Sequence, residues 1–316
     1  MRTSWQFSRA RHRALAAGFA AAAVAFSSVP ALAEGEKAPA TAEKGQAPIM
    51  VIAHRGGAMN RPENTMPAFR HAVNLGVEIV ELDMVMTADD RVVVYHDGTI
   101  NPGFCTPDAG SKVVAGPVRG LTFAQTHQFD CGSAVRPGYA GETFVAAPGA
   151  QIPSLDEALD ELAASKAIVF AETKVPKPAP GVADIDPVKF ATLVNDAVRK
   201  HGLEDRIILQ SFDFRTIDAL HRINPQIRTC LLGAPKVTQN YLALLRRHHA
   251  SCIVLSDTEV DRDRVRQLQE AGILVFSGVT DTPEGWQKYV DLGVNAIFAN
   301  DAEGLIGFLR RLGLRP

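Results

Sequence analysis

A histidine and an arginine stand side by side at the end of the first apolar run of the chain. Residues 49–53 are followed by His54, Arg55 and two glycines. An imidazole titrates near neutral pH and transfers protons, whereas a guanidinium can hold two oxygens of an anion at once. The glycines allow a ligand to approach the backbone closely. The pattern predicts acid–base chemistry on an anionic substrate.

Carboxylates occur at the ends of two further apolar runs. Glu81 and Asp83 lie two residues apart in the second run, and Glu172 ends the third, with Lys174 two residues later. Side chains alternate along a strand, so each of these pairs shares one face. Buried carboxylates need a cation or protons to neutralise them, and Ca²⁺ and Mg²⁺ accept such oxygen ligands. The three acids predict a divalent-cation site, and Lys174 predicts a phosphate contact.

A second histidine is expected close to these acids. The run 92–96 follows the second strand after a few polar residues, too few for a crossover helix, so the two runs predict an antiparallel hairpin. Centring the turn on Asp89 and Asp90 places Asp83 opposite His96. The imidazole would then join the carboxylates at the end of the second strand.

Apolar runs and helical patterns alternate along most of the chain and would position these residues. Eight strand-then-helix units in about 265 residues predict an α/β fold, a (β/α)₈ TIM barrel whose catalytic face lies at the carboxyl ends of the strands. A doubly wound open sheet is the main alternative, but no glycine-rich phosphate fingerprint follows the first strand. Asn64 or Thr65 caps the first helix, and Ser154 with Glu157 forms a capping box. The predicted strands are 49–53, 79–85, 167–172, 207–211, 228–232, 252–255, 273–277 and 296–299. The predicted helices are 66–75, 154–164, 187–201, 214–223, 237–249, 261–271, 283–292 and 304–312.

Residues 99–151 follow neither a helix nor a strand period, and we expect a small insertion over the barrel mouth. The four cysteines allow three pairings. Cys105 and Cys131 share this insertion and are the preferred disulfide. Cys230 and Cys252 lie in or beside strand-like runs and are expected to be buried thiols.

The amino terminus has the features of an export signal. Four arginines without an acid precede an alanine-rich apolar stretch, and Ala31-Leu32-Ala33 has the form of a cleavage site. The predicted divisions are a signal peptide at 1–33, a linker at 34–48 and the barrel at 49–316. We expect an exported protein, periplasmic or secreted, without stable membrane insertion.

The composition is that of a globular protein. The 316 residues include 33 Lys and Arg against 35 Asp and Glu, and 46% are hydrophobic. These values exclude a disordered chain or a coiled coil. There is no basic excess of the kind that nucleic-acid binding requires, so no nucleic-acid partner is expected.

The ordered motifs resemble those of the glycerophosphodiester phosphodiesterase family, a family of PLC-like phosphodiesterase TIM barrels. The resemblance runs from about residue 49 to about residue 309. It departs from the family pattern at 276–279 and 298–301, near the expected place of the alcohol group, so the preferred alcohol stays open. The motifs that carry it are His54-Arg55-Gly56, Pro62-Glu63-Asn64-Thr65, Glu81-x-Asp83, His96-Asp97 and Glu172-x-Lys174.

The resemblance implies metal-dependent hydrolysis of small-molecule glycerophosphodiesters to glycerol 3-phosphate and an alcohol. The attacking group would be water or the substrate's own glycerol hydroxyl, and the resemblance favours the hydroxyl. The implied roles are His54 and His96 as the acid–base pair, Glu81, Asp83 and Glu172 as ligands of one divalent cation (Ca²⁺ or Mg²⁺), Arg55 and Lys174 as phosphate contacts, and Glu63 beside the glycerol or bracing the loop.

Two other functions are compatible with these residues. One is a barrel that binds phosphodiesters without turning them over, and the pair of histidines argues against it. The other is a phospholipase D-type enzyme acting on lysophospholipids. A broad aromatic patch on the insertion would favour that enzyme, and the chain has only two Trp and four Tyr.

Overall fold

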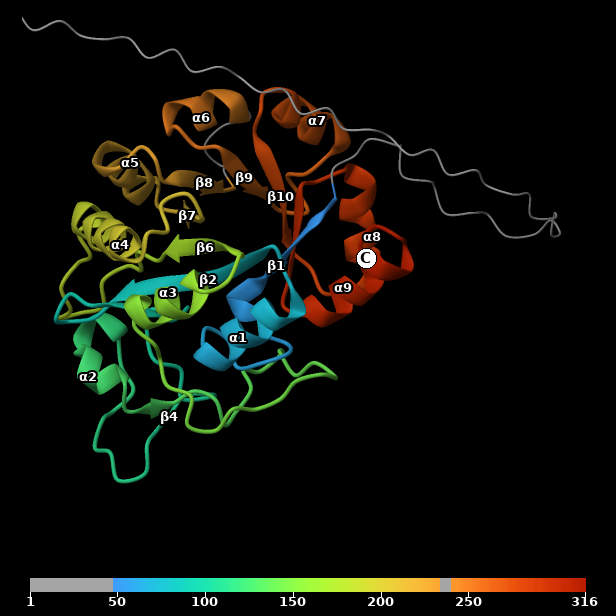
Figure 1. Cartoon of the computed structure of the whole chain (residues 1–316). Helices are drawn as coiled ribbons and strands as arrows, with labels where there is room; N and C mark the ends of the chain where they lie inside the picture. Colours follow the sequence, from blue (N-terminus) through green and yellow to red (C-terminus); the bar gives the residue numbers. More distant parts are fainter. Residues whose placement is uncertain (1–47, 234–239) are drawn as a thin grey trace, which may run out of the picture. The chain divides into compact units, whose positions relative to one another are not determined.

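Eight parallel strands close into a barrel in the computed structural model, which describes residues 48–233 and 240–316 (Figure 1). The strand order is β1-β11-β10-β9-β8-β7-β6-β2, and pairing of β1 with β2 completes the ring. The predicted (β/α)₈ architecture is therefore confirmed. The predicted signal peptide and linker lie outside the described residues, apart from residue 48.

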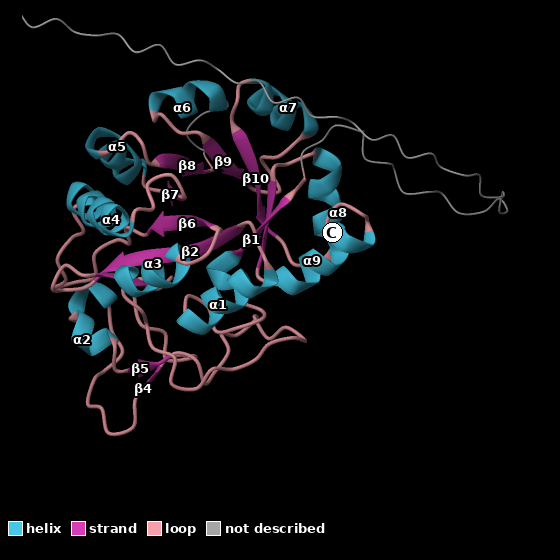
Figure 2. Cartoon of the chain, in the orientation of Figure 1, coloured by secondary structure: helices cyan, strands magenta, loops and turns pink. Residues whose placement is uncertain are grey.

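Helices cover the outer side of the barrel strands (Figures 1 and 2). The strands are β1 Met50–Ala53, β2 Ile79–Met86, β6 Ile168–Thr173, β7 Ile207–Ser211, β8 Arg228–Leu232, β9 Cys252–Leu255, β10 Leu274–Val279 and β11 Ala296–Ala299. The helices are α1 Met66–Leu75, α3 Leu155–Ala163, α4 Pro187–His201, α5 Phe214–Ile223, α6 Tyr241–Arg247, α7 Arg262–Glu270, α8 Pro283–Leu292 and α9 Ala302–Arg311. The predicted helix at 237–249 begins outside the described residues, and its described part contains α6.

Side-chain caps fix where the helices of the first units begin. Thr65 accepts a hydrogen bond from the backbone of Ala68 at the start of α1. Ser154 and Glu157 form the predicted capping box of α3. These caps satisfy amide groups that have no partner within the helix. The loop between β1 and α1 is thereby anchored at its far end.

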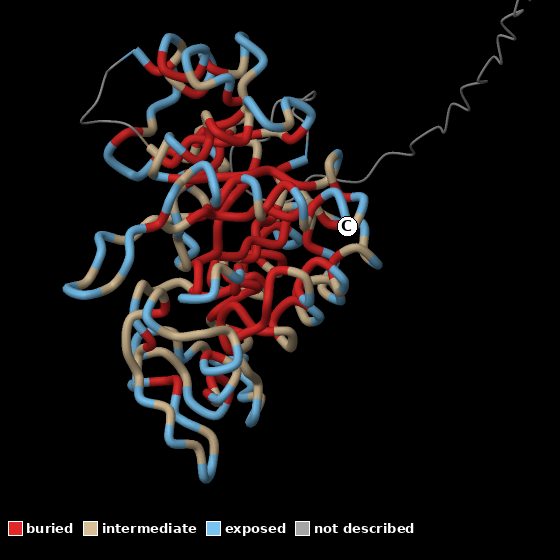
Figure 3. The backbone as a smooth tube through the Cα atoms, turned by 90° about the vertical axis from the view of Figure 1, so that its left-hand side faces the viewer, coloured by how far each residue is buried: buried red, intermediate tan, exposed pale blue. Residues whose placement is uncertain are grey.

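The barrel interior has an apolar floor. Phe170 meets Phe276 and Phe298 at ring-centroid distances of 5.4 and 5.6 Å. Figure 3 shows how buried residues gather in the middle of the described structure. The floor consists of Ile52, Ile79, Phe170, Ile208, Cys230, Cys252, Phe276, Ala296 and Phe298. Since side chains alternate along a strand, the positions two residues further on face the same way. They are polar at five places, namely His54, Glu81, Glu172, Gln210 and Asn300.

Cys230 and Cys252 form a disulfide, so the expectation of two buried thiols is wrong. Parallel pairing of β8 with β9 places the two residues at the same register position. Both are fully buried in the barrel floor. A crossover connection hides this register in the sequence, because the runs alone do not show which residues become neighbours.

The hairpin that extends β2 has a register one residue away from the predicted one. Strand β3, Val92–Val94, runs antiparallel to β2, and the backbone of Tyr95 donates to Asp83. Tyr95, rather than His96, is therefore the residue opposite Asp83. Thr87 N–H bonds to the carbonyl of Arg91, which closes a three-residue loop instead of a two-residue turn.

The insertion after β3 packs into a small core that it shares with Val85 of β2 and Val93 of β3. It contains β4 Thr106–Pro107, β5 Phe129–Asp130, the 3₁₀ turn η2 Val118–Gly120 and the short helix α2 Phe123–Thr126. The disulfide Cys105–Cys131 lies in this core. Within the described residues, no helix is long and apolar enough to cross a membrane.

Candidate active site

The carboxyl end of β1 turns sharply beneath the site. Residues His54–Gly56 form the 3₁₀ turn η1, and Arg55 has a positive φ of 53°. Its backbone N–H donates to Glu81 Oε2 at 2.7 Å. This bond ties the end of β1 to β2. Gly56 packs closely on Ala68, and a Cβ at position 56 would lie 2.8 Å from the alanine side chain.

Glu81, Asp83 and Glu172 bring three carboxylate oxygens within 4.8 Å of one another. All three residues are buried. Pairing of β2 with β6 places Asp83 beside Glu172. Gln210 donates to Glu81 Oε1 at 3.0 Å and fixes its orientation. The structure thus brings the three predicted metal ligands together.

The three carboxylates differ in their tendency to ionise. Burial and the neighbouring acids raise the pKa of Glu81 well above its usual range, and burial followed by Asp83 raises the pKa of Glu172 to about 7. Burial opposes ionisation of Asp83 too, but Lys174 and Arg55 hold its pKa below the usual range. Lys174 Nζ lies 3.1 Å from Asp83 and 2.8 Å from Glu172.

These residues fit a hard divalent cation. Such ions prefer carboxylate oxygens, and repulsion among three buried acids is what a bound cation would relieve. Asp83 Oδ1 is buried, and the contact it makes is the ion pair with the Lys174 ammonium at 3.1 Å. Its other oxygen accepts from Asn64 at 2.8 Å, which holds the carboxylate in place.

His54 is held through Nδ1. Asn300 Nδ2 donates to Asp281, so the amide oxygen of Asn300 faces His54, where it accepts from Nδ1 at 2.7 Å. His54 Nε2 then lies 3.9 Å from Glu81. Burial and the charge of Arg55 lower the pKa of His54 to about 3, so the ring is neutral at neutral pH.

His96 follows β3 and is also held through Nδ1, in this case by the carboxylate of Asp97 at 2.7 Å. Burial opposes ionisation of Asp97, but hydrogen bonds from His96 and Arg136 keep its pKa below the usual range. An ionised carboxylate only accepts hydrogen bonds, so Nδ1 carries the proton. His54 Nε2 lies 3.9 Å from Glu81, and His96 lines the same cavity as Glu172, so both rings lie beside the carboxylate cluster.

Arg55 and Glu63 lie together at the side of the cluster. Arg55 donates from one nitrogen to both oxygens of Glu63 at 3.2 Å, and its Nε lies 3.4 Å from Asp83. Arg136 from the insertion also binds both Glu63 oxygens. Of the two roles suggested for Glu63, this arrangement favours bracing of the loop.

A cavity of about 850 Å³ opens beside the acidic cluster. His96, Glu172 and Lys174 line it, together with residues at the ends of β7 and β8. Phe212, which follows β7, also lines the cavity and is 71% exposed. The cavity offers room for an organic group next to the carboxylates.

Four supporting residues escaped the sequence interpretation. Gln210 and Asn300 are polar residues at inward strand positions, a signal that the alternation pattern contains. Asn64 was noted as a helix cap and as part of a family motif, without a role at the site, whereas it binds Asp83. Arg136 lies in the irregular insertion, where no periodicity marks it.

Clustered carboxylates, paired imidazoles and two cations at the mouth of a (β/α)₈ barrel define a barrel phosphodiesterase. The Glycerophosphoryl diester phosphodiesterase family model matches residues 54–303. The chain therefore belongs to this family.

Individual relatives agree with this assignment. A glycerophosphodiester phosphodiesterase from Caldanaerobacter subterraneus is 27% identical over 264 residues, which cover 84% of this chain and 99% of the relative. The solved structure of an Oleispira antarctica phosphodiesterase, in complex with the product sn-glycerol-3-phosphate, has the same fold, with a TM-score of 0.68. Its sequence is 19% identical, and the match covers 83% of this chain and 97% of that one. A human lysophospholipase D is 56% identical over only 46 residues, 15% of each chain.

Proposed function

We propose that this protein hydrolyses glycerophosphodiesters to glycerol 3-phosphate and an alcohol, with one divalent cation, Ca²⁺ or Mg²⁺. The observation that carries the proposal is that two imidazoles, each held through Nδ1, lie beside three clustered carboxylates, His54 at 3.9 Å from Glu81 and His96 in the cavity that Glu172 lines. The relative from Caldanaerobacter has this activity in its name, and the Oleispira structure contains this product.

Glu81, Asp83 and Glu172 would hold the cation. When bound, it would supply positive charge that offsets the charge on the non-bridging phosphate oxygens. Arg55 and Lys174 lie on either side of Asp83 and add positive charge at the same place. This charge lowers the electrostatic barrier that a phosphodiester anion presents to a nucleophile.

The two histidines have partners of different charge, which suits them to opposite roles. A carboxylate partner stabilises an imidazolium, so His96 beside Asp97 is suited to protonate the leaving alkoxide. His54 has a neutral amide partner and is suited to remove the proton from the attacking oxygen. That oxygen belongs to water or to the glycerol hydroxyl, and accumulation of a cyclic phosphate would identify the hydroxyl.

The direct test is release of glycerol 3-phosphate from glycerophosphocholine, with and without a chelator. We expect release, its loss on chelation and its recovery with Ca²⁺ or Mg²⁺. His96→Ala should lower kcat by roughly a hundredfold, while His201→Ala on α4 serves as a control outside the site. Full activity after exhaustive chelation contradicts the metal requirement.

The same assay separates the two alternatives. Substrate binding without turnover would identify a non-catalytic phosphodiester-binding barrel. Faster turnover of lysophosphatidylcholine than of glycerophosphocholine would identify a lysophospholipase D-type enzyme. The short match to the human enzyme is too small a part of either chain to favour it.

We further infer that the protein is exported, to the periplasm or the medium. The amino-terminal arginines and apolar stretch support this inference, as do two disulfides, because disulfides persist in oxidising compartments. Cell fractionation tests it, and recovery of the intact chain in the cytosol alone would contradict it.

A further inference from the structure

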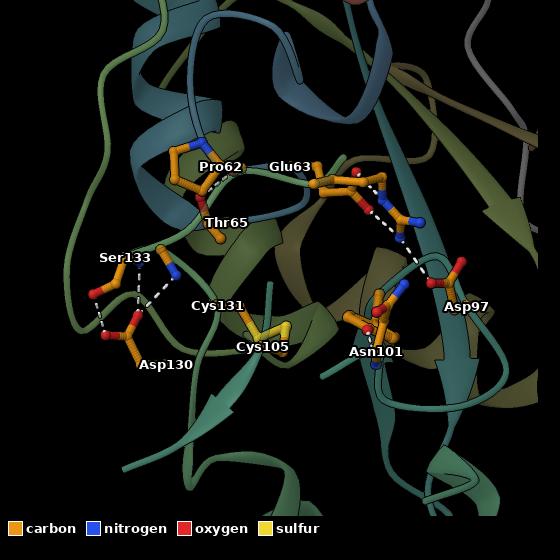
Figure 4. Close-up of a disulfide and its surroundings, with 12 residues drawn as sticks. Pro62, Glu63, Thr65, Asp97, Asn101, Cys105, Asp130, Cys131 and Ser133 are labelled. Atoms are coloured by element: carbon orange, nitrogen blue, oxygen red, sulfur yellow. Dashed lines mark hydrogen bonds and ion pairs between the residues drawn. A yellow bond between two sulfur atoms is a disulfide. The ribbon is translucent and has the colours of Figure 1, made fainter. Parts of the chain in front are cut away.

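Charged side chains of alternating sign link the loops that carry the two histidines. Both oxygens of Glu63 accept from Arg136, at 2.7 and 2.8 Å, and from Arg55 at 3.2 Å. Arg136 also donates to Asp97 Oδ2 at 2.8 Å. The other oxygen of Asp97 accepts from His96. Figure 4 shows Glu63 and Asp97 at this junction.

Arg136 alone among these residues comes from the insertion. Its guanidinium lies 4.4 Å from the centre of the Phe104 ring, a cation–π contact. Phe104 directly precedes Cys105, which the disulfide joins to Cys131 (Figure 4). The core of the insertion therefore fixes the position of this guanidinium.

We propose that Arg136 is a positioning residue for His96, acting through Asp97. The Asp97 side chain is 26% exposed, so by itself it has freedom to rotate. Arg136 binds Oδ2 and leaves Oδ1 for Nδ1 of His96, which orients the imidazole and leaves Nε2 for proton transfer. The proposal rests on the proposed function, in which His96 acts on the leaving group.

The first test compares two arginines of the insertion. Arg119 is the matched control, since its side chain is 15% exposed against 16% for Arg136, and it too forms an ion pair with the barrel, at Asp90. We expect Arg136→Met to lower kcat about tenfold or more with a smaller change in KM, as loss of an outer-shell partner does. Arg119→Met should stay within about twofold of wild type.

A conservative variant separates charge from geometry. Arg136→Lys keeps the charge but lacks the forked donors that bind two carboxylates at once. It should recover only part of the lost kcat. A raised KM with unchanged kcat in Arg136→Met would indicate a merely structural role of the insertion and would overturn the proposal.

The decisive measurement combines Arg136→Met with His96→Ala, using glycerophosphocholine as substrate. If Arg136 acts through His96, the second change should lower turnover by less than about twofold once His96 is absent. An undiminished tenfold effect in the His96→Ala background would mean that Arg136 acts through Glu63 and Arg55 instead, and the proposal would be wrong.

A measurement that does not need turnover is the downfield NMR signal of the Nδ1 proton shared by His96 and Asp97. Its loss in His96→Ala assigns it. We expect it in Arg119→Met and expect it shifted or broadened in Arg136→Met, and an unchanged signal there contradicts the proposal. If wild type and His96→Ala turn over substrate equally, the proposed function of His96 fails. If His96→Ala lowers turnover but Arg136→Met changes neither turnover nor the NMR signal, this inference fails while the proposed function stands.

Discussion

Removal of the Cys105–Cys131 disulfide should loosen the insertion, and the free energy involved follows from the length of the loop that the bridge closes. The bridge joins residues 26 apart. In the chain-entropy model, closing such a loop stabilises the fold by about 3.5 kcal/mol. Because about 1.4 kcal/mol corresponds to a factor of ten, Cys105→Ser with Cys131→Ser should raise the open population of the insertion roughly a few hundredfold.

Hydrogen exchange measures this population directly. The backbone N–H of Cys131 donates to the carbonyl of Ala150, and that of Asp108 donates to Gln128, both within the insertion. Their exchange should accelerate by roughly a few hundredfold in the serine variant, since opening exposes both amides. The Val169 amide of the barrel strand β6 should keep its wild-type rate.

The second disulfide provides the control. Cys230 and Cys252 are 22 residues apart, so their bridge has nearly the same loop entropy, about 3.4 kcal/mol. It joins β8 to β9 inside the barrel, and its loss should therefore lower the free energy of global unfolding. The reasoning is refuted if removal of Cys105–Cys131 accelerates barrel amides as much as insertion amides, or leaves the insertion amides unchanged.

Three further outcomes follow from the site and the core. Glu172→Gln should weaken Ca²⁺ or Mg²⁺ binding in a calorimetric titration, because one of three clustered ligands loses its charge, and equal affinity would contradict the metal assignment. Asn300→Leu should lower kcat about tenfold, because His54 loses the acceptor of its Nδ1 proton, and unchanged steady-state kinetics would argue against this role. Phe170→Ala should lower the free energy of unfolding, measured by urea denaturation, by about 3 to 5 kcal/mol, because the ring is fully buried in the barrel floor. A loss below about 1 kcal/mol would mean that the floor repacks.

The positions of the barrel strands were predictable because each is a short apolar run between helical patterns. The carboxylate cluster was predictable for a related reason. Glu81 and Asp83 alternate with buried apolar residues, so the pleat alone puts them on one face. Glu172 joins them because parallel strands of a barrel end at the same face.

Features that depend on register were not predictable from the sequence. The loop of the hairpin contains Asp90 in the left-handed region, at φ 59°, which favours a three-residue loop over a two-residue turn. That single difference moves the residue opposite Asp83 from His96 to Tyr95. Pairing of Cys230 with Cys252 likewise depends on how β8 and β9 align across a crossover.

Arg136 could not be predicted from the sequence for a different reason. It lies in a segment without periodicity, held by a disulfide and by contacts to distant loops, so no local pattern marks it as functional. Polar residues at inward strand positions, in contrast, could have been found from the sequence. Gln210 and Asn300 follow the apolar floor by two residues and could have been selected by the alternation rule that identified Glu81.

The groups that would bind metal and the groups that would move protons are supported by different parts of the fold. Glu81, Asp83 and Glu172 lie on β2 and β6, whose backbone pairing places them side by side. The histidines lie beyond the ends of their strands, where no ladder continues, and each depends on a neighbouring side chain to hold its ring. Damage to the insertion should therefore reduce turnover while cation binding persists, whereas damage to β2 should remove both.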